Sequence, residues 1–283
     1  MQFQSNLTAS AGAAKLLLVS FAFMASLANA ADLHPLVTSK YWTSVGAFFA
    51  NSDFSANAQG GAGGEDERVD FETSMGLDDR PDLLDLEFGW QFGRKWGLSL
   101  QYFVADRERT RTLEEAIEWE GVTYDFGAVI KATTDFEVTR LFFSRQVWKN
   151  ERHDLRLGAG IHYLRLAAEI SGEATLDDES KEFRASEASA SFPVPDIGAW
   201  YRFSPTDRWL LDARVDWFSA NVGDYSGSLW NFAVGANFRL HKNVGIGLSY
   251  QLFELNGSVR DTNWNGDVRT RFAGPEINLT GFW

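Results

Sequence analysis

The chain closes on Pro275-Glu276-Ile277-Asn278-Leu279-Thr280-Gly281-Phe282-Trp283, a stretch in which apolar and polar side chains alternate. Successive side chains of a β-strand point to opposite faces, so Ile277, Leu279 and Trp283 share one face. The opposite face carries the polar residues Glu276, Asn278 and Thr280. This pattern predicts a strand that is apolar on one side, polar on the other, and ends on an aromatic residue.

The same alternation recurs along the chain. It is regular in 84–92, 96–104, 209–217, 230–240 and 244–252, and less regular in 41–53, 135–148, 155–170, 188–203 and 268–283. A strand that crosses a membrane needs about 9–11 residues, apolar toward lipid and polar toward the lumen. The sequence therefore predicts an all-β fold, a transmembrane antiparallel up-and-down β-barrel of about ten strands, with eight to twelve left open. In 135–148 the facing is ambiguous, because Phe142 and Phe143 are adjacent.

Short and long connections alternate between these segments. The short ones are 93–95, 149–152, 204–207 and 241–243, and the long ones are about 54–82, 107–134, 171–187, 218–228 and 254–267. Outer-membrane barrels have short periplasmic turns and longer outer loops. An even number of strands then predicts that both termini lie in the periplasm.

A soluble β-sandwich or soluble barrel also has alternating strands. Its apolar faces point inward, however, where ten strands rich in Trp and Phe would overfill one core. Trp90, Trp96, Trp209 and Trp217 fall near strand ends, as expected for the aromatic girdles at the two membrane interfaces. These positions favour the membrane barrel.

The beginning of the chain has the pattern of a secretory signal peptide. Lys15 precedes a short apolar run, 16–27, and Ala28-Asn29-Ala30 fits a cleavage site of small residues. A transmembrane helix is the alternative, but this run is too short to span a bilayer. We expect a signal peptide at 1–30 and the barrel at 31–283, located in the cell outer membrane.

Composition excludes several classes of function. The chain has no Cys, which excludes disulfides, a lipidated cysteine and thiol catalysis. Its net charge of −13 argues against nucleic acid as a partner, because phosphates require Lys and Arg. No motif in the sequence calls for a cofactor.

A family resemblance rests on four stretches in particular. They are Met75-Gly76-Leu77-Asp78-Asp79, the hairpin from Phe88 to Leu100, Phe192-Pro193-Val194-Pro195-Asp196-Ile197-Gly198, and Gly223-Asp224-Tyr225-Ser226-Gly227-Ser228. With these, residues 31–283 resemble small outer-membrane β-barrels of Gram-negative bacteria, distantly similar to outer membrane protein W and porin-like proteins. The resemblance implies outer-membrane lipid and lipopolysaccharide as surroundings. It also implies an assembly machinery that reads the last strand through Trp283, Leu279 and Ile277, but no activity.

Charged residues fall on the predicted lumen face. They are Asp85, Glu87, Arg156, His162, Asp196, Arg202, Asp212, Arg214, Asp216, Arg239 and Glu276. They could form a selectivity ring or a salt-bridged plug, and the narrow lumen of a ten-stranded barrel favours the plug. We expect a non-enzymatic protein, either a narrow channel for small solutes or a structural or adhesive barrel with acidic outer loops.

Catalysis is the alternative function. A barrel hydrolase acting on lipids or peptides needs a His beside a nucleophile or carboxylate. His162 is the histidine within a predicted strand, and no nucleophile motif accompanies it. A lipid hydrolase or protease using His162 is therefore the second hypothesis, and a hydrogen-bonded lumen residue is the simpler interpretation.

Two features could bind cations. Asp261, Asn263, Asn265 and Asp267 repeat at every second position, as at the start of a calcium loop, but Phe272 stands where the bidentate Glu belongs. A turn at a loop tip is the alternative. Acidic residues also cluster in three predicted loops, where they could share divalent cations with lipopolysaccharide or simply be solvated. They are Glu65, Asp66, Glu67, Asp70 and Glu72; Glu114, Glu115, Glu118 and Glu120; and Asp177, Asp178, Glu179 and Glu182.

Overall fold

The computed structural model describes residues 33–59, 69–77, 80–119, 122–176, 180–222, 225–260 and 265–283. The predicted signal peptide lies outside these residues. The described chain is nearly all β, with a short helix, α2 (Pro35–Thr38), ahead of the first strand. Among the described residues, no helix has both the length and the apolar character needed to cross a membrane.

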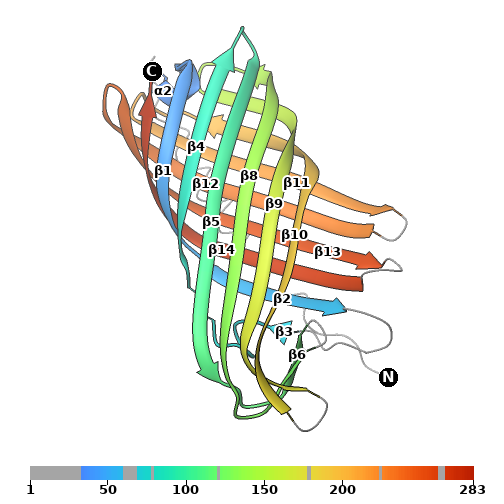
Figure 1. Ribbon diagram of the computed structural model, residues 1–283. Coiled ribbons are helices and arrows are strands. Elements are labelled where there is room, and N and C mark those ends of the chain that lie inside the picture. The colour runs from blue at the N-terminus through green and yellow to red at the C-terminus, as the bar shows by residue number, and fades with distance from the viewer. Residues whose placement is uncertain are drawn as a thin grey trace, which may run out of the picture.

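Antiparallel strands form a closed ten-stranded barrel (Figure 1). In order around the barrel they are β1 (Tyr41–Phe49), β4 (Asp82–Phe92), β5 (Trp96–Thr112), β8 (Val129–Lys149), β9 (His153–Leu176), β10 (Ser180–Phe203), β11 (Trp209–Val222), β12 (Tyr225–His241), β13 (Val244–Arg260) and β14 (Asn265–Phe282). The barrel closes where β14 pairs with β1, from Trp42 opposite Phe282 to Phe48 opposite Glu276. The prediction of an antiparallel barrel with about ten strands is confirmed.

Four further strands are additions to this barrel. They are β2 (Asn51–Gln59), β3 (Val69–Asp70), β6 (Ile117–Trp119) and β7 (Val122–Tyr124). The predicted strand 41–53 is interrupted at Ala50, after which β2 leaves β4, stays paired with β14, and meets the short β3. The β6–β7 hairpin meets β9 at the pair Thr123–Thr175.

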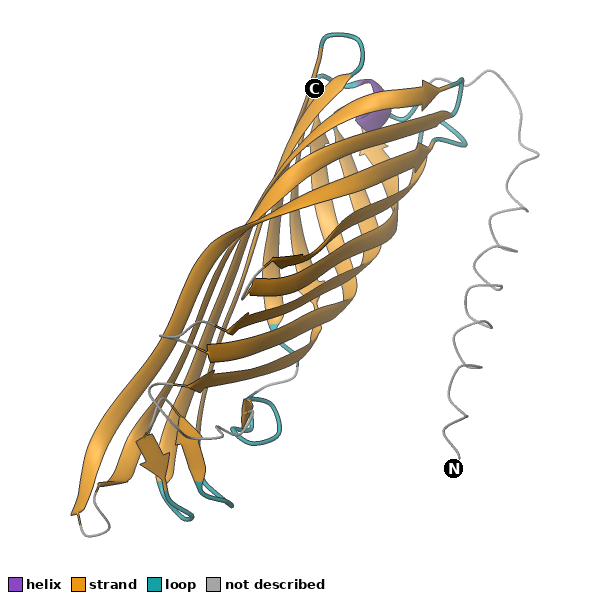
Figure 2. Cartoon of the chain, turned by 90° about the vertical axis from the view of Figure 1, so that its right-hand side faces the viewer, coloured by secondary structure: helices purple, strands orange, loops and turns teal. Residues whose placement is uncertain are grey.

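The two ends of the barrel differ. At the end that we call the short-turn end, the strands are joined through 93–95, 150–152, 204–208 and 242–243, as predicted, and both Tyr41 and Trp283 lie there (Figures 1 and 2). At the opposite, extended end, β8 has 21 residues and β9 and β10 have 24 each. At about 3.3 Å per residue such strands are roughly 70–80 Å long, far more than a bilayer requires.

The predicted long loops were therefore wrong in extent. Most of 107–134, 171–187, 218–228 and 254–267 continues the neighbouring strands. In part of this region the alternation is inverted: Ile130, Ala132 and Ile170 are buried in an apolar cluster, and Lys131, between the first two in sequence, is exposed. Other parts, such as 171–187, consist mainly of polar, small and charged residues, which periodicity of hydrophobic residues does not distinguish from a loop.

The wall divides toward the extended end. Beyond the pair Ile197–Trp217, β10 pairs with β9 but no longer with β11. One wall then consists of β5, β8, β9 and β10, and the other of β11 to β14 with β2 and β3 (Figure 2). We call the gap between β10 and β11 the β10–β11 seam.

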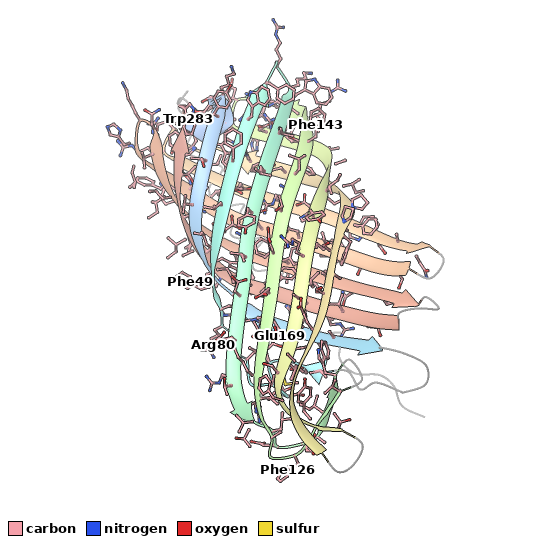
Figure 3. All side chains as sticks on the ribbon, in the orientation of Figure 1. Phe49, Arg80, Phe126, Phe143, Glu169 and Trp283 are labelled. Atoms are coloured by element: carbon pink, nitrogen blue, oxygen red, sulfur yellow. The ribbon has the colours of Figure 1, made fainter. Side chains whose placement is uncertain are left out.

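An apolar belt surrounds the barrel near the short-turn end. Exposed apolar side chains such as Leu86, Ile161, Leu248 and Leu279 face outward there, while Asp85 and other polar side chains face the lumen, as predicted. Phe143 and Trp283 lie at the short-turn margin of this belt (Figure 3). At the opposite margin of the belt, Trp217 and Trp230 face outward. Beyond this margin, toward the extended end, the outward-facing side chains are charged, as at Asp106, Glu137 and Arg165.

Candidate functional site

The lumen is occupied by three successive layers of side chains, beginning with a plug at the short-turn end. Helix α2 sits in the mouth and buries Leu36 against Trp42, Leu210 and Phe282. Pro35 presets the first helical turn, and the N–H of Leu36 donates to His34 Nδ1 at 3.2 Å. Sequence periodicity missed this plug, because a four-residue helix is too short to show a period.

Two arginines tie the plug and the mouth to the barrel wall. Arg202 is buried, donates to the Leu36 carbonyl oxygen at 2.8 Å, and stacks 3.7 Å from the centre of the Trp200 ring. Arg156 pairs with Asp154 at 3.0 Å. Both were predicted to be lumen residues, and both lie at the boundary between the plug and the next layer.

Arg239 lies apart from the other predicted lumen charges. It forms an ion pair with Asp207 at the short-turn mouth, where its side chain is partly exposed. Its role is therefore separate from the charged layer deeper in the barrel.

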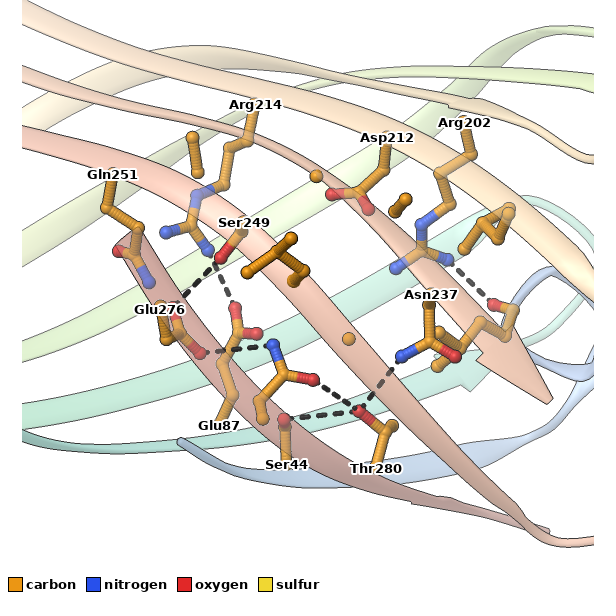
Figure 4. Close-up of a pocket in the computed structure, with 18 of the residues that line it drawn as sticks. Ser44, Glu87, Arg202, Asp212, Arg214, Asn237, Ser249, Gln251, Glu276 and Thr280 are labelled. Carbon is orange, nitrogen blue, oxygen red and sulfur yellow. Dashed lines mark hydrogen bonds and ion pairs between the residues drawn. The ribbon is translucent and has the colours of Figure 1, made fainter. Parts of the chain in front are cut away.

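The second layer is a network of charged and amide groups that we call the lumen network (Figure 4). Arg214 donates to Glu87 at 2.7 Å and to Gln101 at 2.9 Å. Gln101 in turn donates to Asp85 at 2.7 Å. These residues come from β4, β5 and β11, so the network crosses the lumen from one wall to the other.

Arg140 was missing from the predicted set although it is central to the lumen network. It pairs with Asp216 through contacts of 2.7 and 2.9 Å, and the two side chains are 1% and 0% exposed. The structure resolves the ambiguity in this strand: Phe142 is buried and Phe143 is exposed, so even-numbered residues of β8 up to Gln146 face the lumen. Knowing that parity would have identified Arg140 from the sequence.

His162 is engaged at both ring nitrogens. Nδ1 lies 3.0 Å from Asp196 Oδ2, and Nε2 lies 3.3 Å from the Asn231 amide nitrogen. An amide nitrogen can only donate, so Nε2 accepts and Nδ1–H donates to the carboxylate. The side chains of His162 and Asp196 are completely buried. This arrangement leaves neither nitrogen free for a reacting group.

A polar cavity of about 80 Å³ lies between the plug and the network. Glu276 accepts from Ser249 at 3.2 Å on its wall, and Asp212 lines the opposite side (Figure 4). At about 15 Å³ per water, the cavity has room for roughly five water molecules. Such a cavity can hydrate buried charges without forming a pore.

The third layer is aromatic. Phe103, Phe136, Phe253 and Phe272 meet across the lumen with ring centres 5.0 to 6.3 Å apart. They belong to a buried apolar cluster contributed by strands all around the barrel. Plug, lumen network and aromatic layer thus follow one another along the lumen axis.

The predicted cation sites are only partly described. Asp261 and Asn263 lie outside the described residues, and Asn265 and Asp267 belong to β14, opposite Arg260 and Ser258. The described residues contain no group of three or more His, Asp or Glu side chains placed to hold a metal ion.

The acidic loops are also mainly outside the description, with one exception to the expected solvation. Glu72 forms an ion pair with Arg107 at 2.5 Å and accepts from the Phe54 N–H at 2.8 Å. It holds the segment after β3 against β2 and β5 instead of facing solvent. Glu114, by contrast, is exposed beside Arg111.

Comparison with solved structures identifies the architecture. The outer membrane protease OmpT from Escherichia coli superposes with a TM-score of 0.53 at 11% identity, covering 87% of this chain and 98% of that one. The fold is that of an outer-membrane β-barrel. The translocator domain of the autotransporter NalP from Neisseria meningitidis gives a TM-score of 0.46 at 10% identity, with 97% and 96% of the two chains covered. No family model matches the chain, and no curated protein matches its sequence.

Proposed function

We propose that the protein is an integral outer-membrane barrel with a closed lumen, a non-enzymatic structural or adhesive protein and not a solute channel. The observation that carries this proposal is the filling of the lumen by three layers, from the short-turn mouth to the far margin of the apolar belt. A conducting barrel needs a continuous water path, whereas here the aromatic layer and the α2 plug lie on either side of the lumen network.

The apolar belt supports membrane insertion. Its outward faces run from Trp96 to Val104 on β5 and from Leu155 to Tyr163 on β9, each a length of nine residues. A tilted strand of about 9–11 residues crosses the hydrocarbon layer. We place the short-turn end in the periplasm, by analogy with the short turns of outer-membrane barrels. Tyr41 at the start of β1 and Trp283 then both lie on the periplasmic side. The assembly machinery would read Trp283, Leu279 and Ile277 there, all of which face outward.

The extended end supports a binding role at the cell surface. Its strands reach far beyond the belt, and Phe126 is 74% exposed near its tip (Figure 3). Phe183, on β10 opposite Glu173 of β9, is 70% exposed. Exposed aromatic side chains are typical of protein interaction surfaces. In this placement the wall would pass through the lipopolysaccharide layer on its way to the tip, and the acidic loops would share divalent cations there. Melting in lipopolysaccharide with and without millimolar magnesium checks that cation role.

Catalysis through His162 remains the alternative and has one supporting observation, the carboxylate of Asp196 at its ring. A general base must reach a substrate proton, however. The His162 ring is buried beneath the aromatic layer, with Phe253 at 6.1 Å, and its second nitrogen is occupied by Asn231. We assign the pair a structural role in the lumen network.

Orientation and closure can be tested together. The chain has no Cys, so one introduced cysteine is the only thiol. Phe126→Cys at the extended end should react with a membrane-impermeant maleimide on intact cells, and Lys242→Cys at a short turn only after permeabilisation. The purified protein should not make liposomes permeable to small sugars. Sugar flux that is proportional to the protein content would overturn the closed-lumen proposal, and reversed labelling would overturn the orientation.

A further inference from the structure

A large cavity lies outside the lumen network. It has a volume of about 640 Å³ and separates the inner faces of β9 and β10 from those of β11 to β14. Its walls are mainly apolar, with Leu166, Phe192 and Val194 on one side and Phe218 and Leu255 on the other. This volume falls within the range of about 300–1,000 Å³ typical of small-molecule sites.

The cavity lies behind the β10–β11 seam, and the sequence keeps that seam open. Pro193 and Pro195 lie just before Ile197, the residue at which β10 begins to pair with β11, and they still pair with Tyr163 and Ile161 of β9. Proline has no N–H to donate, so it is confined to sheet edges. The two prolines therefore leave β10 as a free edge where β11 would otherwise join it.

The position of the seam relative to the apolar belt determines which molecules can reach the cavity. Trp217 marks the far margin of the apolar belt on β11, and Tyr163 marks it on β9. The seam begins at this margin, since its last pair is Ile197–Trp217. The seam therefore opens at the level of the lipid headgroups of one leaflet and continues from there toward the extended end.

Trp119 supplies an indole N–H to the wall of this cavity, whose mainly apolar lining also includes Glu187, Asn256 and Asp267. The β6–β7 hairpin places its side chain in the wall, where it is 2% exposed. Among the described residues, its indole N–H has no hydrogen-bond acceptor. An unpaired buried donor costs about 1–3 kcal/mol, which a ligand oxygen would recover.

We propose that the cavity binds one acyl chain that enters through the β10–β11 seam and presents a carboxyl or ester oxygen to the Trp119 indole. The apolar walls accept the chain, the seam connects the cavity to the membrane, and the tryptophan recognises the head. A free fatty acid and an acyl chain of an outer-leaflet lipid share this chemistry. The inference rests on the proposed membrane placement and is independent of whether the lumen conducts.

Photolabelling tests the site directly. Wild-type protein in phosphatidylethanolamine–phosphatidylglycerol vesicles is illuminated with a diazirine-bearing palmitic acid, and the labelled residues are mapped by mass spectrometry. We expect label on the inner faces of β10 and β11 in addition to label on the belt. A parallel experiment with a diazirine-bearing phospholipid distinguishes the free acid from a membrane lipid as the source of the chain.

Matched variants separate the cavity from the surrounding lipid. Ala190 lines the cavity on the inward face of β10, and Ala185 is exposed on the outward face of the same strand. Ala190→Trp should lower the cavity label by an order of magnitude, about tenfold for 1.4 kcal/mol of lost affinity, while Ala185→Trp leaves it unchanged. Ala220→Trp fills the cavity from β11 and serves if Ala190→Trp does not refold.

The head contact has its own variant. Trp119→Phe keeps an aromatic ring but removes the N–H, so it should weaken labelling by the acid severalfold and leave labelling by a diazirine-bearing hexadecane unchanged. Label restricted to the belt, or equal effects of Ala190→Trp and Ala185→Trp, would overturn the site in a protein that still inserts in the membrane. Equal loss of both probes in Trp119→Phe would overturn the head contact.

Discussion

Replacing Arg140 by Met is the sharpest test of the lumen network. The substitution keeps an unbranched side chain but removes the guanidinium that pairs with Asp216 at 2.7 Å. Asp216 is completely buried and would lose its principal partner. Breaking a buried pair in this way typically costs about 3–5 kcal/mol. Asn231 at 3.3 Å and Arg214 at 4.0 Å still face the carboxylate, so we expect a value near the lower limit, about 3 kcal/mol.

The matched control is Arg165→Met. Arg165 also pairs with a carboxylate, Glu137 at 3.5 Å, but its side chain is 64% exposed. Exposed pairs contribute about 0–1 kcal/mol. The free energy of unfolding of both variants can be measured by urea titration in vesicles, followed through tryptophan fluorescence. Adding Asp216→Asn to Arg140→Met should cost less than the sum of the two single changes. Equal destabilisation by Arg140→Met and Arg165→Met would refute the network as a structural element.

Three further predictions address the belt, the plug and the end of the chain. Leu248→Arg, on the lipid-facing side of β13, should lower the free energy of unfolding by about 2–4 kcal/mol. Ser249→Arg should lower it less, because Ser249 lies beside Glu276. Equal losses would mean that this strand is inserted differently. The pKa of His34 is lowered from 6.5 to about 4, first by burial and then by Arg239 and Arg202. The unfolded state thus binds more protons than the folded state between pH 6.5 and about 4, so docking of α2 should weaken as the pH falls through that window. His34→Gln should flatten the profile of Trp42 fluorescence against pH. Deleting Trp283 should leave refolding yield in detergent nearly unchanged but lower the outer-membrane level in cells; a normal level would show that Trp283 is only the last residue of a strand.

The sequence predicted the membrane-facing part of the fold well. Lipid on one side and a polar lumen on the other impose a period of two, and segments such as 84–92 and 244–252 follow it residue by residue. The short turns were also predicted, because Gly93 with its positive φ and the polar residues around Asn243 have few alternative roles.

The remaining parts depend on contacts between distant residues. Segment 171–187 consists mainly of polar, small and charged residues, so its sequence does not distinguish a strand from a loop. The break at Ala50 occurs where the pairing of β1 with β4 stops and β2 continues along β14 alone. The local sequence around Ala50 does not indicate this change of partners. The alternation of inward and outward positions along each strand identified the candidate lumen charges but not their partners. Partners such as Arg140 and Asp216 are separated by 76 residues in the sequence.

Single-channel current across a planar bilayer tests the closed lumen most directly. The reconstituted wild-type protein should show no steady conductance, since the α2 plug, the lumen network and the aromatic layer occupy the lumen in succession. The control is a variant in which Phe103, Phe136 and Phe272 are changed to Ala and residues 33–38, which include α2, are deleted. It should show measurable conductance steps, which would demonstrate that the assay detects an opened barrel. Stable, ion-selective openings of the wild-type protein would contradict the account.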